Sequence, residues 1–319
     1  MGSALSNAGC VATLADALGL DLHEQTVPRK YVHRASVSEV LLTGWREIGE
    51  DTFLLGSQWP RSHSFYRAVA GRHDPLMMAE TIRQAGMLLS HAGYGVPTDY
   101  PFLLWNVSYQ LDAAGLAVGD TPADLTLRAT CRDLKFRRGV LSSLRCDAEV
   151  YRDGRRMGRG SMRLDCMPPE TYARIRQQAP QSAEPAGPGL RHEHGVAADS
   201  VLIPTEHPYC WRVEADPSHP VLFDHPVDHV PGMVLGEAMR QAVGRLAGRE
   251  EMVLSGLDIS FVRYAEFHLP VLLRVFPGPE RDGERIVRAV VEQGGETVAY
   301  GVLRLSEGVV AAQPAAAVR

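Results

Sequence analysis

The sequence carries the same helical motif twice, and this duplication constrains the fold more than any other feature. The runs ETIRQAG at 80–86 and EAMRQAV at 237–243 share Glu, Arg, Gln and Ala in register, at an offset of 157 positions. Self-similarity at a fixed offset is the signature of a repeated structural unit. With 319 residues, 45% of them apolar, the chain is long enough to fill two cores. We therefore expect two similar domains.

The segments around each motif follow the same order. A short apolar run comes first, at 38–45 and at 199–206, and the helix follows it. Four segments of strand character then close each half: 102–111, 124–134, 141–151 and 157–166 in the first, and 256–264, 269–276, 285–293 and 297–305 in the second. Turn signals at 152–156 and 293–296 precede the last strand of each half. The pattern predicts an α+β fold in which each repeat wraps an antiparallel sheet round a central helix.

A break separates the halves. Residues 179–189, APQSAEPAGPG, combine three prolines with small residues, which disfavours helix and strand alike. We interpret this run as a linker between an N-terminal repeat at 1–178 and a C-terminal repeat at 190–319.

The polar side chains of each motif share one helical face. Their spacing of i, i+3 and i+4 is the same in both copies, which comprise Glu80, Arg83 and Gln84 in the first, and Glu237, Arg240 and Gln241 in the second. The rest of each helix is apolar, so these groups are expected to be buried, and a buried carboxylate must pair, protonate or face a polar cavity. A self-contained Glu–Arg ion pair is the structural alternative. Because the trio occurs twice, we favour a functional site.

The start of the second helix offers hydrogen-bond donors. Pro231-Gly232 leaves free backbone N–H groups at the positive end of the helix dipole, where a thioester carbonyl or an oxyanion would bind. The first repeat has Pro75 at the corresponding place, which offers no N–H, so the two sites are not expected to be equal.

Histidines and aspartates lie close to this helix start. His225 and His229, beside Asp224 and Asp228, have the spacing of metal ligands on a helix, but Pro226 and Pro231 break any helix there. We therefore predict no metal site and no cofactor. A loop histidine held by a neighbouring aspartate is the commoner arrangement, with an acid–base role as the alternative.

Composition excludes several classes of protein. The net charge is −5 and no run is dense in Lys or Arg, so a nucleic-acid partner is not expected. The five cysteines are far apart and form no C-x-x-C, which argues against a disulfide framework and a zinc site and is typical of a cytoplasmic protein. No apolar run reaches the roughly 18 residues of a membrane span. We expect neither membrane nor nucleic acid as a partner.

Longer motifs resemble a known family. The runs KYVHRASVSEVLLTGW, QWPRSHSFYR, HDPLMMAETIRQAGMLLSHAGYGVP and DHPVDHVPGMVLGEAMRQA are similar to those of the AfsA (A-factor biosynthesis) family in both halves. The helix start VPGMVLGEAMRQA also resembles that of hotdog-fold acyl-carrier-protein dehydratases. The resemblance implies a double hotdog that transfers a β-ketoacyl group from acyl carrier protein to a hydroxyl of dihydroxyacetone phosphate. Its product would lead to γ-butyrolactone, butenolide or furan signalling molecules.

This chemistry needs a base, oxyanion donors and a phosphate clamp. We predict Glu80 or Glu237 as the catalytic base and direct transfer without an acyl-enzyme. The predicted substrate-binding residues are Arg83, Gln84, Arg240, Gln241, Gly232, His73, His229, Arg61 and His63. Arginines are proposed for the phosphate because their planar fork binds it in bidentate fashion. Since two fused repeats already supply a pair of hotdogs, either a monomer or a homodimer is expected.

Other functions remain as alternatives. A hotdog thioesterase or dehydratase would use the same cavity, although the dehydratases' catalytic His position, fourteen residues before the Glu, holds Tyr66 and Phe223 here. A non-catalytic protein that binds a small ligand and regulates a partner is the third possibility. No basic recognition helix stands out, which disfavours direct DNA binding.

Overall fold

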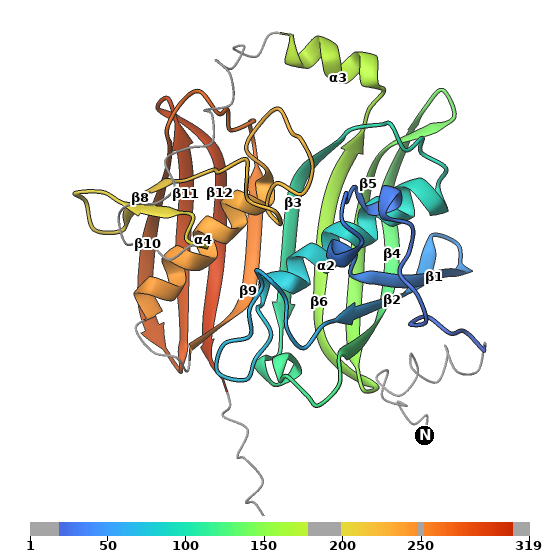
Figure 1. Cartoon of the computed structure of the whole chain (residues 1–319), viewed down its shortest axis with the longest axis horizontal. Coiled ribbons are helices and arrows are strands. Elements are labelled where there is room, and N and C mark those ends of the chain that lie inside the picture. The colour runs from blue at the N-terminus through green and yellow to red at the C-terminus, as the bar shows by residue number, and fades with distance from the viewer. Residues whose placement is uncertain (1–18, 178–198, 248–251, 309–319) are drawn as a thin grey trace, which may run out of the picture.

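One antiparallel sheet organises the whole molecule. The computed structural model describes residues 19–177, 199–247 and 252–308, and the predicted linker at 179–189 lies outside them. In this described part the sheet has twelve strands, and Figure 1 shows how they are arranged. The strands are β1 Leu42–Gly49, β2 Thr52–Trp59, β3 Phe102–Leu111, β4 Ala123–Arg137, β5 Val140–Arg152, β6 Arg155–Cys166, β7 Leu202–Pro204, β8 Cys210–Val213, β9 Met252–Phe261, β10 Val271–Arg281, β11 Glu284–Gln293 and β12 Glu296–Glu307.

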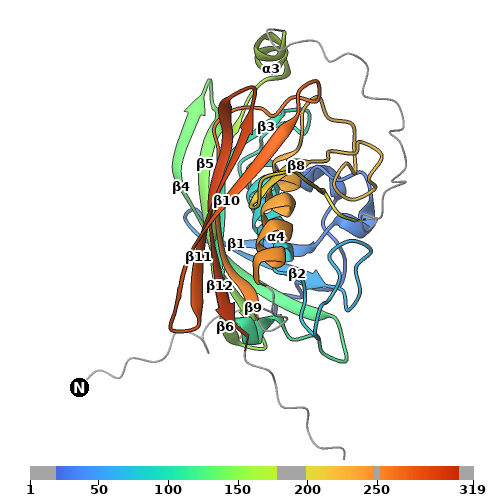
Figure 2. The ribbon, with the colours of Figure 1, turned by 90° about the vertical axis from the view of Figure 1, so that its left-hand side faces the viewer.

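Three α-helices accompany the sheet in the described residues. They are α2 Leu76–Leu88, α3 Pro169–Arg176 and α4 Gly232–Ala247, and short 3₁₀ or π turns occur at Arg29–Val32, Val37–Glu39, Leu89–Gly93 and Ala113–Leu116. The helices α2 and α4 cover the same face of the sheet, and none of the described helices lies on its other face (Figure 2). None of the described helices is long and apolar enough to cross a membrane.

The strand order confirms the duplication. From one edge the sheet reads β1-β2-β4-β5-β6-β3, and from the other it reads β7-β8-β10-β11-β12-β9. Each repeat thus has two strands, a helix and four strands, arranged in the same way. The two halves meet where β3 pairs with β9, from Asn106 opposite Ser260 to Gln110 opposite Gly256. The α+β double-hotdog prediction is confirmed.

The predicted strands follow the observed ones closely in the long hairpins, because their side chains alternate between core and solvent. In β4, for example, Leu125, Leu127 and Ala129 are buried and their neighbours less so. The short runs before the helices match less well. The run at 38–45 becomes a strand only at Leu42, since Val37–Glu39 forms a 3₁₀ turn, and the run at 199–206 contributes only Leu202–Pro204.

Helix α2 is buried along its full length, as the apolar sequence round its polar trio predicts. All of its thirteen residues are buried, including Glu80 at 2% exposure and Gln84 at 0%. Such burial requires that every charge on the helix finds a partner.

Candidate active site

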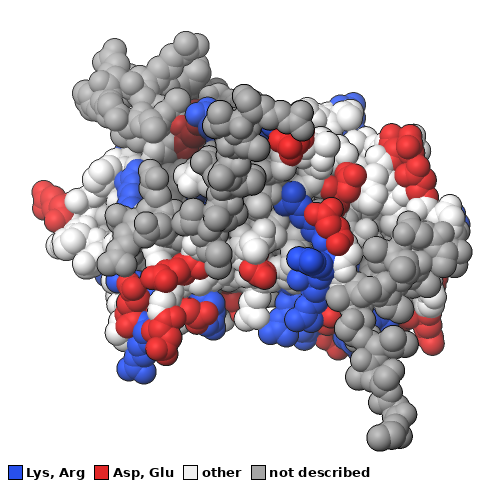
Figure 3. All heavy atoms as spheres, turned by 90° about the horizontal axis from the view of Figure 1, so that it is seen from below, with Lys and Arg blue, Asp and Glu red and all other residues white. Residues whose placement is uncertain are grey.

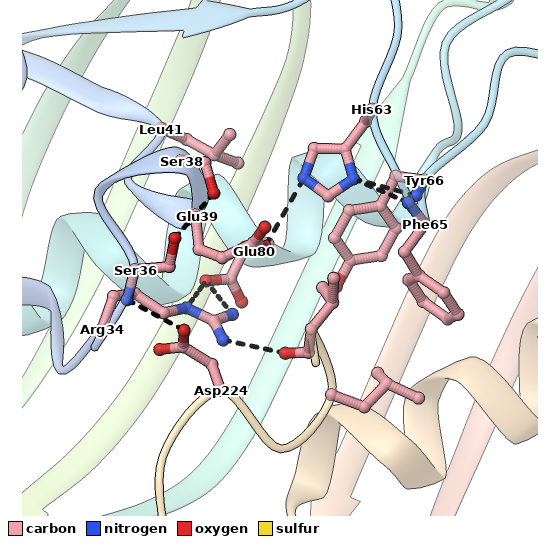
Figure 4. A network of polar contacts seen from close by, with 12 residues as sticks. Arg34, Ser36, Ser38, Glu39, Leu41, His63, Phe65, Tyr66, Glu80 and Asp224 are labelled. Carbon is pink, nitrogen blue, oxygen red and sulfur yellow. Dashed lines mark hydrogen bonds and ion pairs between the residues drawn. The ribbon is translucent and has the colours of Figure 1, made fainter. Parts of the chain in front are cut away.

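Glu80 on α2 accepts hydrogen bonds from three side chains. The Nε and Nη2 atoms of Arg83 lie 2.8 Å from its two oxygens, and the Nε2 atom of Gln84 lies 2.7 Å away. Arg34, from the loop before β1, adds bonds of 3.1 and 2.6 Å from its Nε and Nη2 atoms. Figure 4 shows Arg34 between Glu80 and the loop that carries Asp224. The carboxylate therefore neutralises one of two arginines, which leaves the cluster with a net positive charge.

The electrostatics of this cluster keep Glu80 ionised. Burial alone would raise its pKa, but Arg34 and Arg83 outweigh that effect and hold the pKa well below its usual range. A carboxylate that already accepts five hydrogen bonds is a weak proton acceptor. Glu80 thus suits a positioning role, in which it orients Arg34 and Arg83, better than the role of a base.

Asp224 of the second repeat fixes the loop that carries Arg34. Its oxygens accept the backbone N–H groups of Ala35 and Ser36, at 2.5 and 3.0 Å. The Nη1 atom of Arg34 also donates to the carbonyl of Val221, at 3.2 Å. The position of Arg34 is therefore set by both repeats.

Glu237 on α4 repeats the arrangement with a different charge balance. Arg240 donates to its two oxygens at 2.8 and 2.6 Å, and Gln241 donates at 2.6 Å. Here the additional partner is acidic, because Asp74 from the loop before α2 lies 3.5 Å from the Nε atom of Arg240. One arginine here faces two carboxyl groups, whereas in the first cluster two arginines face one glutamate. Burial raises the pKa of both Asp74 and Glu237, and Arg240 opposes that effect.

The two glutamines have a structural task in common. Gln84 accepts the N–H of Leu41 at 2.9 Å and donates to the carbonyl of Glu39 at 2.7 Å. Gln241 likewise accepts the N–H of Val201 at 3.0 Å and donates to the carbonyl of Asp199 at 2.8 Å. Each glutamine therefore ties its helix to the segment that precedes the repeat's first strand.

The helix N-termini differ as the sequence predicts. At α2 the first three N–H groups are satisfied, by the side chain and carbonyl of Asp74 and by the carbonyl of Pro75. At α4 the N–H groups of Gly232 and Met233 have no acceptor within the described residues, and both residues line a cavity. Only the α4 terminus can therefore offer donors to a ligand.

This first cavity, of about 620 Å³, lies between the repeats. It joins the second half of α2 to the first turn of α4 and the loop before it, and its lining includes Arg34, Arg83, His225, His229, Gly232 and Tyr264. Its volume is in the range typical of small-molecule sites. The cavity thus brings Arg83, Gly232 and His229 together, and Glu80 lies behind Arg34 and Arg83 rather than in the lining.

A second cavity, of about 360 Å³, occupies the opposite end of the helix pair. It joins the loop before α2 to the second half of α4 and to the ends of β9 and β12, and it brings together His73, Asp74 and Arg240. The two cavities have corresponding positions in the repeats. Their different charged groups and helix termini show that the duplication has produced two unlike sites.

His225 is a titratable group that lines the first cavity. Its Nδ1 atom is buried without a hydrogen-bond partner among the described residues and lies 3.7 Å from Asp224 Oδ2. Burial lowers the pKa of His225, and Arg83 and Arg34 lower it further. The ring is therefore neutral at pH 7 and can accept a proton.

Other predicted residues lie outside the cavity linings. His63 accepts the N–H groups of Phe65 and Tyr66, both at 3.1 Å, and its Nε2 atom lies 3.5 Å from Glu39 (Figure 4). Arg61 is exposed and donates to the carbonyl of Gly119 at 3.0 Å. These contacts give both residues structural tasks. In the described part of the chain, no group of three or more His, Cys, Asp or Glu side chains could hold a metal ion.

Arg34 and Asp74 belong to the clusters but were not among the site residues predicted from the sequence. Both are separated from their helical partners along the chain, and neither is part of the repeated motif. The signal available for Asp74 was its place directly before the helix start, where Asp is a favoured capping residue.

The fold and the two cavities define a double-hotdog protein with cavities at the interface of its repeats. The chain belongs to the AfsA family, A-factor biosynthesis hotdog domain, whose family model matches residues 17–168 and 176–306. A relative from Streptomyces virginiae named 2-oxo-3-(phosphooxy)propyl 3-oxoalkanoate synthase is 41% identical over 86% of this chain and 95% of its own. A relative of the same name from Streptomyces coelicolor is 37% identical over 90% and 94%.

A solved structure agrees with the fold assignment. The 12:0-ACP thioesterase from Umbellularia californica superposes with a TM-score of 0.50 at 11% identity, over 80% of this chain and 94% of that one. At this identity the likeness concerns the fold alone.

Proposed function

We propose that this chain is an acyltransferase that forms 2-oxo-3-(phosphooxy)propyl 3-oxoalkanoate in γ-butyrolactone biosynthesis. It moves a 3-oxoacyl group from the thioester of an acyl carrier protein to a hydroxyl of dihydroxyacetone phosphate. Family membership and the relatives' shared name, at 41% and 37% identity over most of both chains, support this assignment.

The observation that carries the proposal is the pairing of two arginines with an open helix N-terminus in one cavity. Arg34 and Arg83 both pair with Glu80 and line the cavity, so their guanidinium groups can bind the phosphate of the acceptor. The N–H groups of Gly232 and Met233 suit the thioester carbonyl oxygen and the oxyanion that forms from it. One cavity then holds both substrates.

His225 is the proton acceptor in this scheme. The acceptor's hydroxyl oxygen attacks the thioester carbon, and the neutral ring of His225 takes the hydroxyl proton as the C–O bond forms. The tetrahedral intermediate then collapses, the C–S bond breaks, and the thiolate leaves with that proton as a thiol. The products are an ester and the free carrier thiol, and no acyl-enzyme is needed.

The predicted base role of a glutamate stays a prediction. Glu237 is its better candidate, because burial raises its pKa whereas Glu80 is held ionised by Arg34 and Arg83. In our scheme Glu80 positions the phosphate clamp, and the acid–base work falls to His225.

The decisive experiment supplies a 3-oxoacyl carrier thioester with and without dihydroxyacetone phosphate and follows thiol release and ester formation. We expect thiol release to require the acceptor and to match ester formation one to one. Rapid thiol release without the acceptor would identify a hydrolase, and loss of water from a 3-hydroxyacyl thioester would identify a dehydratase. Binding of either substrate without turnover would support a non-catalytic role.

A further inference from the structure

The second cavity contains two buried polar atoms that lack partners. Nη1 of Arg72 and Nε2 of His73 make no hydrogen bond within the described residues, and both residues line the cavity. His73 is 3% exposed, so solvent does not satisfy its ring. A buried donor or acceptor without a partner is costly and therefore rare. Two of them line one 360 Å³ cavity, where a bound ligand can supply the missing partners.

The unpartnered groups suit an oxyanion. Arg72 has no ion pair with any described carboxylate, and Asp74, which lines the same cavity, is paired with Arg240. Burial, aided by Arg152, lowers the pKa of His73 to about 4, so the ring is neutral at pH 7 and offers one N–H. A cationic guanidinium beside a neutral N–H donor matches a carboxylate or phosphate oxygen.

Further charged groups lie round the cavity. Arg67, at the rim, is largely exposed and paired with Asp199 at 2.9 Å. Seen from below, Lys and Arg side chains gather over part of the surface, with Asp and Glu side chains next to them (Figure 3).

Apart from Asp74 and Arg240, which pair with each other at 3.5 Å, the remaining wall of the cavity is apolar. It includes side chains of the loop before α2, of α4 and of the ends of β9 and β12, among them Pro75, Val243 and Leu254. Such a wall favours a hydrocarbon chain through burial of apolar surface. A ligand that satisfies both parts of the cavity has an anionic head and an acyl or alkyl chain.

We propose that the second cavity is a separate binding site for an anionic acyl ligand, whose carboxylate or phosphate head is held by Arg72 and His73. This site binds the ligand without transferring its acyl group. The first three N–H groups of α2 already have acceptors, so none of them is free to bind a tetrahedral oxyanion. This site is independent of the proposed chemistry in the first cavity.

Calorimetric titration with octyl phosphate tests the proposal on the full chain. We expect Arg72→Gln to remove one equivalent of octyl phosphate, or to weaken its Kd at least about tenfold, as loss of a charge-assisted hydrogen bond predicts. The matched control Arg274→Gln removes an exposed arginine that pairs with Glu292 on β11, and it should titrate like the wild type. An Arg72→Gln protein that titrates like the control overturns the site.

Two further measurements keep the result interpretable. Octanol has the chain without the anionic head, so equally tight binding of octanol at the Arg72-dependent site would overturn the oxyanion assignment. Titration with octanoate distinguishes a carboxylate site from a phosphate site. Because Arg72 Nη1 has no partner, Arg72→Gln should keep the wild-type Tm. Arg83→Gln alters only the first cavity. This variant should still bind the equivalent of octyl phosphate that depends on Arg72, whatever the function of the first cavity proves to be.

Discussion

The carboxylate of Asp74, which precedes α2, lies 3.5 Å from the guanidinium of Arg240 on α4. Asp224 makes the reverse connection, from the loop before α4 to the backbone of the first repeat at Ala35 and Ser36. Each repeat thus completes the polar cluster of the other. Since a buried charge is tolerated only with its partner, the two repeats should fold and unfold together.

Replacing Asp74 by Asn tests the cluster of Glu237 and Arg240. Asn can still accept the N–H of Leu76, so the helix cap survives. Burial raises the pKa of Asp74 above its usual 3.8, against the effect of Arg240. A carboxyl group whose pKa is raised by folding contributes stability that is present at low pH and lost as the pH rises through the folded-state pKa. The stability advantage of the wild type over Asp74→Asn should therefore shrink above pH about 4.

Urea unfolding at a series of pH values from about 4 to 8 measures this difference. An advantage of the wild type that grows with pH would show that Arg240 holds Asp74 ionised, contrary to this account.

Glu80→Gln should show the opposite pH dependence. Arg34 and Arg83 hold the pKa of Glu80 below its usual 4.5 despite burial, so its contribution is present above that pH and lost as the pH falls. Removal of the carboxylate leaves two buried arginines without their counter-charge, which should cost about 3–5 kcal/mol at pH 7. Thermal or urea unfolding at pH 7 and at pH 3 measures the difference in stability between the wild type and Glu80→Gln at each pH.

The control for this variant is Glu149→Gln. Glu149 pairs with Arg156 at the surface, with both side chains about half exposed, and such pairs contribute at most about 1 kcal/mol. Equal losses for the two variants would contradict the special role of Glu80.

The sequence predicted what is local or repeated. The long strands follow from alternation of apolar and polar residues, and the shared face of the Glu–Arg–Gln trio follows from helical spacing. The sequence therefore predicted the repeated α+β fold, whereas it gave the ion pairs of Glu80 and Glu237 only as the structural alternative to a functional site. The unequal helix starts were also predictable, from Pro75 against Gly232. These features depend only on neighbours along the chain.

The sequence could not show which loop completes each cluster. Arg34 and Glu80 are 46 positions apart, and Asp74 meets Arg240 across the two repeats. Neither contact has a period or a spacing that marks it, because the path of the loops decides it. The different partners of the two clusters, two arginines with one glutamate and one arginine with two carboxyl groups, became visible only in the structure.

Alanine substitutions of Gly244 and Gly232 distinguish an effect on backbone conformation from an effect of steric contact. Gly244 lies inside α4, and an added Cβ would meet nothing within 4 Å. Gly244→Ala should therefore stabilise the protein by about 0.5–1 kcal/mol, because Gly in a helix interior is entropically unfavourable. At Gly232 an added Cβ would lie 3.0 Å from the ring of Phe261, which lines the first cavity.

Gly232→Ala should displace that ring into the first cavity and raise the KM for the acyl thioester several-fold, with a smaller effect on the KM for dihydroxyacetone phosphate. Initial-rate kinetics with each substrate varied in turn, together with melting curves, distinguish the two glycine variants. Unchanged KM values for Gly232→Ala would move the thioester away from this helix start.

His225→Gln tests the proposed proton acceptor. Loss of a general base lowers kcat by about 10²–10⁴-fold. Because burial and the neighbouring arginines lower the pKa of His225 below 6.5, wild-type kcat/KM should stay constant down to a pH below 6.5 and then fall as the ring is protonated. In the variant, kcat/KM should no longer show this fall at low pH, which is the acid limb of the profile. The control His229→Gln removes a ring in the same cavity that is bonded to Asp228 at 2.7 Å, and its loss should be less than about tenfold. If His225→Gln instead keeps near wild-type kcat and the acid limb, the base is another residue, and Glu237 becomes the first to replace.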